Sequence, residues 1–158
     1  MASAIHTVEA SGVGRFMREA LYAYPVAETV HIIGLALLFG SIAIVDLRLL
    51  GLGKRIPLGA LVTFAVPWSL VGFAIAASAG LLMFTAHAEE FITQPVFMLK
   101  MGLILAGGLN AAILHTGPLR AFGPDFDAHP TPGVRLAAAL SLVLWLGVIA
   151  CGRFLAYL

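Results

Sequence analysis

The chain has 158 residues, of which 61% are hydrophobic and 11% are charged. Soluble domains carry charges on about 25% of their residues, so this composition excludes a soluble globular fold and favours an integral membrane protein. The formal net charge of +1 gives no electrostatic reason to expect nucleic-acid binding. The single cysteine, Cys151, excludes an intrachain disulfide and an iron–sulfur cluster held by several cysteines.

The first 25 residues interleave charged and apolar side chains, as Arg15, Phe16 and Arg18 illustrate. This pattern predicts a short amphipathic helix lying on the membrane surface. It differs from a signal peptide, which has a charged start, an apolar core and a small-residue cleavage site. We therefore divide the chain into an interfacial segment, residues 1–25, and a membrane bundle, residues 26–158.

Four apolar stretches follow, each long enough for the roughly 20 residues that cross a hydrocarbon layer of about 30 Å. Their approximate bounds are 26–50, 58–86, 96–115 and 134–155. Linkers that contain glycine and proline separate them and are typical turn signals. The expected fold is all-α: an integral membrane four-helix bundle with a short N-terminal amphipathic helix.

The distribution of basic residues predicts the orientation. Five basic residues flank or occupy the first and third loops, namely Arg48, Lys54, Arg55, Arg120 and Arg135. The opposite side has four, namely Arg15, Arg18, Lys100 and Arg153. Because basic residues favour the cytoplasmic side, we expect a bacterial inner-membrane protein with both termini periplasmic.

Polar side chains at membrane depth are costly, so each one is a candidate functional residue. They are His31, Asp46, His87, Lys100, Asn110 and His115. His115 lies 15 residues beyond Lys100, roughly 22 Å further along a helix axis. Since the two axial ring nitrogens of one haem are about 4 Å apart, His31 and His115 do not share a haem.

His31 and His87 lie toward the same side, and each has a carboxylate at helical spacing, Glu28 and Glu90 respectively. Such a carboxylate can orient a metal-bound imidazole. We therefore predict a b-type haem with His31 and His87 as iron ligands and Lys100 beside the cofactor. The alternatives are a hydrogen-bonded packing role for His31, interfacial exposure for His87 and a snorkelling Lys100.

Two further groups admit two interpretations each. Asp46, Arg48 and His115 meet near one membrane boundary, where they form either a structural tie between helices or a proton or quinone site. Gly72, Ala76 and Gly80 recur every four residues. This stripe favours close helix–helix contact, while the alternative is that it makes room for a flat cofactor. The role of Asn110 is left open.

Two segments carry a resemblance to known families. The run from His31-Ile-Ile-Gly34 to Gly40, continuing to Asp46-Leu-Arg48, resembles the first core helix of HemJ-type protoporphyrinogen oxidases. Residues 99–110, with Lys100 near the start and Asn110 at the end, resemble both that family and the CopD copper-resistance membrane family. The continuation through residues 111–115 resembles a family of small bacterial four-helix membrane proteins.

The resemblance implies a b-type haem or a metal in a four-helix bundle, with His31 as ligand and Lys100 near the site. The chain also departs from both families. Leu38-Phe39 replaces the aromatic residue that follows the HemJ histidine motif, residues 134–155 lack the polar side chains of an oxidase, and the five methionines do not cluster as a copper pathway requires.

The sequence therefore favours a membrane-embedded b-type cytochrome-like protein, an electron-transfer or accessory subunit working between quinol and a periplasmic partner. Its expected partners are the lipid bilayer, a quinone or redox protein, and further copies or subunits of a membrane complex. One alternative is a non-redox structural subunit or small transporter. Another is a HemJ-like protoporphyrinogen oxidase, so whether the protein is an enzyme stays open.

Overall fold

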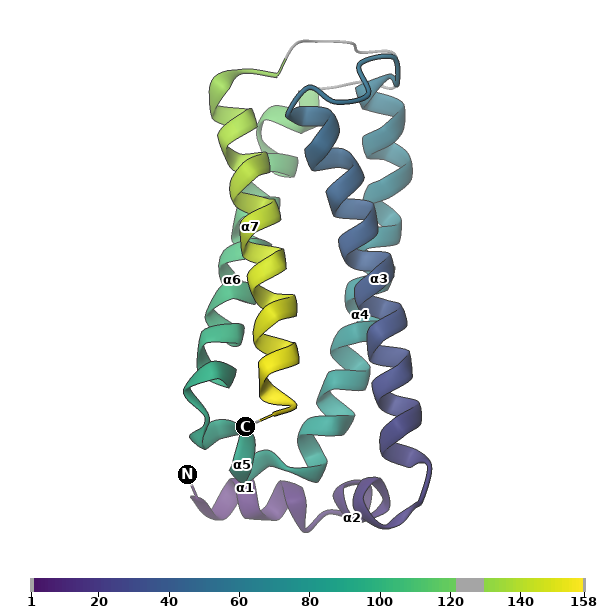
Figure 1. The fold of residues 1–158 in the computed structure, drawn as a ribbon, viewed down its shortest axis with the longest axis vertical. Helices are drawn as coiled ribbons and strands as arrows, with labels where there is room; N and C mark the ends of the chain where they lie inside the picture. The colour runs from purple at the N-terminus through teal and green to yellow at the C-terminus, as the bar shows by residue number, and fades with distance from the viewer. Residues whose placement is uncertain (1, 122–129, 158) are drawn as a thin grey trace.

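The computed structural model describes residues 2–121 and 130–157, which form an elongated bundle of antiparallel helices (Figure 1). Among these described residues, four helices are long and apolar enough to cross a membrane, and they confirm the predicted four-helix transmembrane bundle. They are α3 (Ala23–Leu49), α4 (Leu58–Ala86), α6 (Pro95–Thr116) and α7 (Pro132–Leu155). Helix α3 begins three residues before the predicted start, because Pro25 lies in its first turn, where a missing backbone N–H costs nothing.

The N-terminal segment forms two short helices, α1 (Ala2–Glu9) and α2 (Gly12–Glu19), rather than one. The Ser11 side chain accepts a hydrogen bond from the Gly14 backbone N at 3.1 Å and caps the start of α2. Both helices lie across the end of the bundle where α7 also ends (Figure 1). Two other short elements connect the long helices: α5 (Ala88–Thr93) and the 3-10 helix η1 (Pro118–Ala121).

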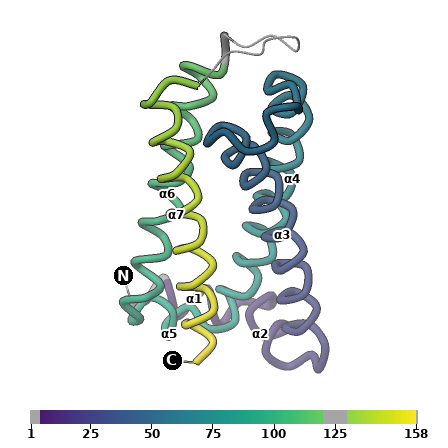
Figure 2. Tube along the Cα trace, turned by 45° about the horizontal axis from the view of Figure 1, so that its top comes forward, coloured from purple at the N-terminus to yellow at the C-terminus, as the bar shows by residue number. Residues whose placement is uncertain are grey.

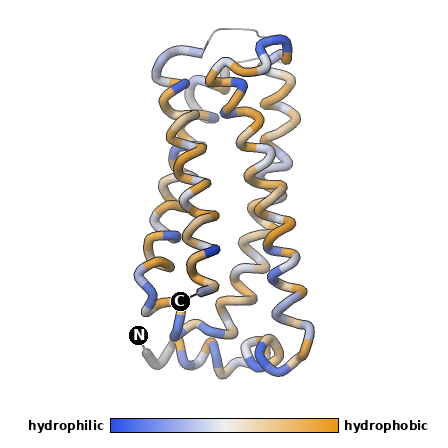
Figure 3. The backbone as a smooth tube through the Cα atoms, in the orientation of Figure 1, coloured by the Kyte–Doolittle hydropathy of each residue, from blue (hydrophilic) through white to orange (hydrophobic). Residues whose placement is uncertain are grey.

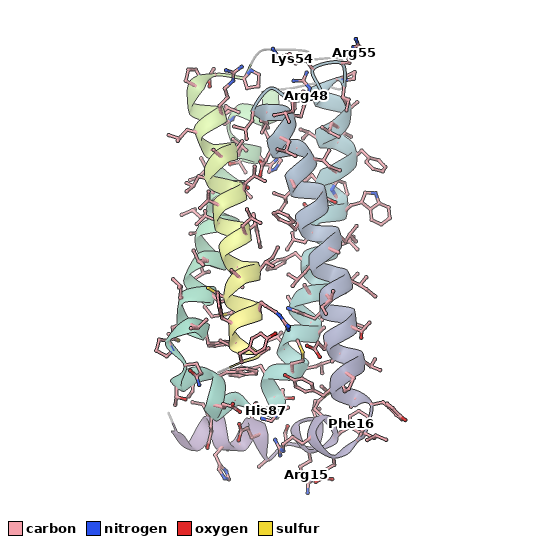
Figure 4. All side chains as sticks on the ribbon, viewed as in Figure 1. Arg15, Phe16, Arg48, Lys54, Arg55 and His87 are labelled. Carbon is pink, nitrogen blue, oxygen red and sulfur yellow. The ribbon has the colours of Figure 1, made fainter. Side chains whose placement is uncertain are left out.

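Helix α2 is fixed to the end of α4 by close backbone approach and by one arginine. A Cβ added at Gly14 would lie 2.6 Å from the Thr85 carbonyl oxygen, so a side chain is excluded there. The Arg18 guanidinium donates to the Ala86 carbonyl at 2.9 Å and to the Glu9 carbonyl at 2.8 Å. The interfacial segment is thereby tied to the bundle, while Phe16 stays 63% exposed (Figure 4).

The long helices associate as two antiparallel pairs, α3 with α4 and α6 with α7, and α7 joins the pairs by packing on α3 (Figure 2). At the centre of the first pair, a Cβ at Gly34 would lie 2.5 Å from Ala76 N, and a Cβ at Gly72 would lie 2.4 Å from Leu38 N. Only glycine permits this backbone contact. The prediction that Gly72 and Ala76 allow close contact between helices is confirmed.

An aromatic contact and an amide hydrogen bond are among the contacts that join the second pair. The Trp145 ring of α7 packs on Gly107 of α6, where an added Cβ would lie 3.3 Å from it. The Asn110 amide nitrogen donates to the Ala137 carbonyl at 3.0 Å. Asn110, whose role the sequence left open, therefore links α6 to α7.

Apolar side chains cover the outside of the bundle as well as its core. Leu49 and Leu58 are fully buried near the α3–α4 loop, whereas Phe64, Leu105 and Leu136 are at least 70% exposed. Figure 3 shows hydrophobic residues along the long helices and hydrophilic ones gathered toward the two ends. This distribution is that of a protein whose outer face contacts lipid.

Candidate functional site

A cavity of about 460 Å³ lies between the two helix pairs, toward the end of the bundle that carries α1 and α2. Cofactor pockets range from about 300 to 1,000 Å³ and are mostly apolar with a few convergent polar groups. The aromatic lining consists of Tyr24, Phe39, Phe84, Phe91 and Phe97. Besides Tyr24, the titratable lining residues are Glu28, His31, Lys100 and Arg153.

His31 is held in one orientation by α4. Its Nδ1 lies 2.7 Å from the Ala76 carbonyl oxygen, which only accepts hydrogen bonds, so Nδ1 donates and Nε2 of the neutral ring keeps its lone pair. The ring lies over Gly80, where an added Cβ would come within 3.3 Å of Cε1. A backbone carbonyl on the second nitrogen is the usual support of a metal-ligating histidine.

This geometry corrects two details of the sequence interpretation. The predicted orienting partner of His31 was Glu28, but the Ala76 carbonyl takes that role, and Glu28 instead lines the same cavity. The stripe of small residues also divides into two functions. Gly72 and Ala76 contact α3, while Gly80 makes room for the His31 ring.

Lys100 of α6 lies on the same cavity as His31, on the side formed by α7. Its Nζ would be 3.2 Å from a Cβ added at Gly152, so the glycine leaves space for the ammonium group. Arg153 follows on α7 and lies over the Tyr157 ring, 4.6 Å from the centroid. Two cationic side chains from different helices therefore line a cavity that also contains an imidazole.

Sequence reasoning missed Arg153 and the aromatic group as parts of the site. Phe84, Phe91 and Phe97 stack on one another with interplanar angles of 15° to 16°. They come from α4, α5 and α6, so no periodicity within one helix connects them. In the sequence analysis Arg153 served only to predict the orientation. Its position next to Gly152, on the same side of the membrane as Lys100, could have indicated that it belongs to the site.

His87 lies at the end of α4, outside the group of residues that line the cavity (Figure 4). Its side chain is 43% exposed, and its Nδ1 lies 3.5 Å from Glu90 Oε2, as the spacing predicted. It is seven residues beyond Gly80, about 10.5 Å along the helix, and contacts the cavity through Tyr24, whose ring centroid is 5.8 Å away. Its role as a second iron ligand stays a prediction.

Within residues 2–121 and 130–157, no group of three or more His, Cys, Asp or Glu side chains could hold a metal ion. A haem iron needs only one or two axial ligands from the protein. This finding therefore leaves the haem prediction untested.

A second polar region lies at the opposite end of the bundle. Asp46 is 3% exposed, and its carboxyl group interacts with the side chain of Ser141 of α7. Arg48 instead donates to the Ile56 carbonyl at 2.8 Å and the Lys54 carbonyl at 3.3 Å, and so braces the α3–α4 loop (Figure 4). The expected tie from Asp46 to Arg48 or His115 is replaced by a tie to Ser141, which the sequence did not single out.

Comparison with curated proteins and with solved structures gives no match. Comparison with protein families gives a match that covers nearly the whole chain. Residues 8–158 match the family of unknown function DUF6644, and the chain belongs to that family.

Proposed function

We propose that this protein is a membrane-embedded b-type cytochrome in which His31 would hold the haem iron. The observation that carries the proposal is the fixed tautomer of His31. The Ala76 carbonyl holds the proton on Nδ1, so Nε2 is the nitrogen with a lone pair, on a ring that lines a cavity of about 460 Å³.

The residues around the cavity suit a haem. Phe39 and the stacked group of Phe84, Phe91 and Phe97 provide flat apolar surfaces for a porphyrin. Lys100 and Arg153 provide positive charge for its two propionates. Haem, when bound, supplies one-electron transfer, and the chain supplies the ligand, the apolar environment and the charge that set its potential.

The resemblance to HemJ-type proteins supports the same pair of residues. The two segments that carry the resemblance contain His31 and Lys100. These residues belong to α3 and α6 and line the same cavity. We place electron transfer ahead of oxidase activity because α7 contributes only a cation, Arg153, to the polar lining of this cavity. Glu28 of α3 is the one carboxylate among the lining residues.

In this proposal the bundle lies in a bacterial inner membrane with both termini periplasmic. The haem cavity is then near the periplasmic side, because α1, α2 and the end of α7 share one end of the bundle (Figure 1). Electrons would pass between quinol in the membrane and a periplasmic redox partner. The non-redox alternative, a structural subunit or small transporter, uses the same helices without a cofactor.

The visible spectrum of detergent-purified protein tests the proposal. A b-type cytochrome gives sharp bands after reduction that a structural subunit lacks, and a colourless protein from haem-supplied cells would contradict the proposal. The spin state of the oxidised haem then tests His87. Two histidine ligands predict a low-spin form that His87→Ala converts to high-spin, whereas a single ligand predicts no change in that variant.

A further inference from the structure

Six polar side chains from all four transmembrane helices meet near the α3–α4 loop, around a cavity of about 20 Å³. They are Ser41, Asp46, Ser69, Asn110, His115 and Ser141. A cavity holds a water-sized occupant once its volume exceeds about 10 to 15 Å³. The space therefore suits one small polar or ionic occupant.

Asp46 brings an unpaired oxygen to this cavity. The residue is 3% exposed, and its Oδ2 has no hydrogen-bond partner among the described residues. The carboxyl group also interacts with the Ser141 side chain. A buried carboxylate without a counter-charge is strongly unfavourable at membrane depth, so a positive partner for Oδ2 would contribute substantially to stability.

The polar donors around Asp46 are directed to backbone carbonyls. Ser69 Oγ donates to the Val66 carbonyl at 2.8 Å, and the Asn110 amide nitrogen donates to the Ala137 carbonyl at 3.0 Å. These bonds leave the Ser69 lone pairs and the Asn110 carbonyl oxygen available as acceptors. With Asp46 Oδ2, the cavity has a surplus of oxygen acceptors over donors.

We infer that this cavity binds one small monovalent cation of the Na⁺ class, with Asp46 as its charged ligand. Carboxylate, amide and hydroxyl oxygens are the ligands that hard cations prefer. A single positive charge neutralises Asp46, whereas a divalent ion would leave a net charge at membrane depth. The inference uses no haem and does not depend on the proposed function.

The bound ion would join the four transmembrane helices at one point, because Asp46 belongs to α3, Ser69 to α4, Asn110 to α6 and Ser141 to α7. His115 also lines the cavity from the last turn of α6 and is the only other titratable side chain among the lining residues. Ligand binding to the folded state alone raises stability in proportion to the logarithm of its concentration. Sodium should therefore stabilise the bundle.

Thermal unfolding of the full chain in detergent tests this inference, with NaCl replacing choline chloride or KCl at constant ionic strength. We expect Na⁺ to raise the unfolding temperature of the wild type well above the effect of choline and K⁺. Asp46→Asn should abolish that increment. Glu89→Gln, which removes an exposed carboxylate at the opposite end, should retain it.

Ser69→Ala keeps the carboxylate and provides a second reading if Asp46→Asn fails to fold. It removes one neutral oxygen ligand, so the apparent Na⁺ affinity should fall about tenfold. Three outcomes would overturn the inference: a wild type that responds equally to Na⁺ and choline, an undiminished Na⁺ response in both variants, or stabilisation by acid alone, which would identify the occupant as a proton with water.

Discussion

The two ends of the bundle use the same four helices for different purposes. Near the α3–α4 loop, helices converge on fully buried Leu49 and Leu58 and leave a cavity of only about 20 Å³ beside Asp46. At the other end a cavity of about 460 Å³ lies between the two pairs. The first end is closed by packing and buried polar contacts, and the second has room for a cofactor.

The glycines follow the same division. Gly34 and Gly72, midway along their helices, face backbone atoms of the neighbouring helix and allow close packing. Gly80 and Gly152, nearer the wider end, face the side chains of His31 and Lys100. Small residues in a membrane helix thus either allow contact between helices or leave space for a functional side chain. The group that the small residue faces on the neighbouring helix shows which role it has.

The largest expected effect comes from closing the helix–helix contact. Gly72→Leu places a side chain where even a Cβ would lie 2.4 Å from Leu38 N, so α3 and α4 must separate. We expect destabilisation at the upper end of overpacking costs, about 3 kcal/mol, measured as a lower unfolding temperature in detergent. A Cβ added at Gly108 would meet no neighbouring group within 4 Å, so Gly108→Leu should fold like the wild type. Equal losses of stability in both variants would refute the division of the glycines.

A larger side chain at the second type of glycine should affect the cofactor more than the fold. Gly80→Leu displaces the His31 ring, because an added Cβ would already lie 3.3 Å from Cε1. Haem content per protein should fall several-fold. The matched variant Gly102→Leu adds the same bulk in open space, and haem loss there would show that the effect is not local to His31.

Removing the cavity lysine should change the redox potential more than the haem content. Lys100→Met keeps the side-chain length and removes a positive charge near the iron. Removing that charge stabilises the oxidised, more positive state of the haem and so lowers its midpoint potential. We expect a decrease of tens of millivolts by redox titration. Arg153→Met should cause a smaller decrease, since Arg153 is exposed and solvent screens it. An unchanged or raised potential in Lys100→Met would place Lys100 away from the cofactor.

The smallest effect is expected at the closed end. His115→Gln keeps part of the hydrogen-bonding capacity of the histidine side chain. His115 lines the cavity of about 20 Å³ and is not among the residues that line the cavity of about 460 Å³. The haem spectrum should be unchanged and the unfolding temperature modestly lower. Loss of haem at unchanged stability would instead assign His115 as a ligand.

The sequence predicted the fold well, because apolar length is a local property and each of the four stretches carries it independently. It also singled out His31 and Lys100, since polar residues are rare at that depth. The supports of His31 were not predictable in the same way. The Ala76 carbonyl is a backbone group that every residue has, and only the register between α3 and α4 brings it to the ring.

The closed end shows the same limit. Asp46 was an evident candidate, but its partner Ser141 lies 95 positions later in the sequence and is a common residue in membrane helices. The spacing rules that suggested Arg48 and His115 describe neighbours on one helix or at one depth. These rules do not identify which helix packs against α3 near Asp46. In the structure α7 packs against α3 and contributes Ser141.

Haem ligation by His31 is tested by comparing the haem content of His31→Ala with that of the wild type, both purified from haem-supplied cells. We expect about one b-type haem per wild-type chain. The His31→Ala variant should lose the haem and still insert, since insertion depends on apolar length. Full haem occupancy in His31→Ala, with unchanged reduced bands, would contradict the assignment of His31 as the ligand.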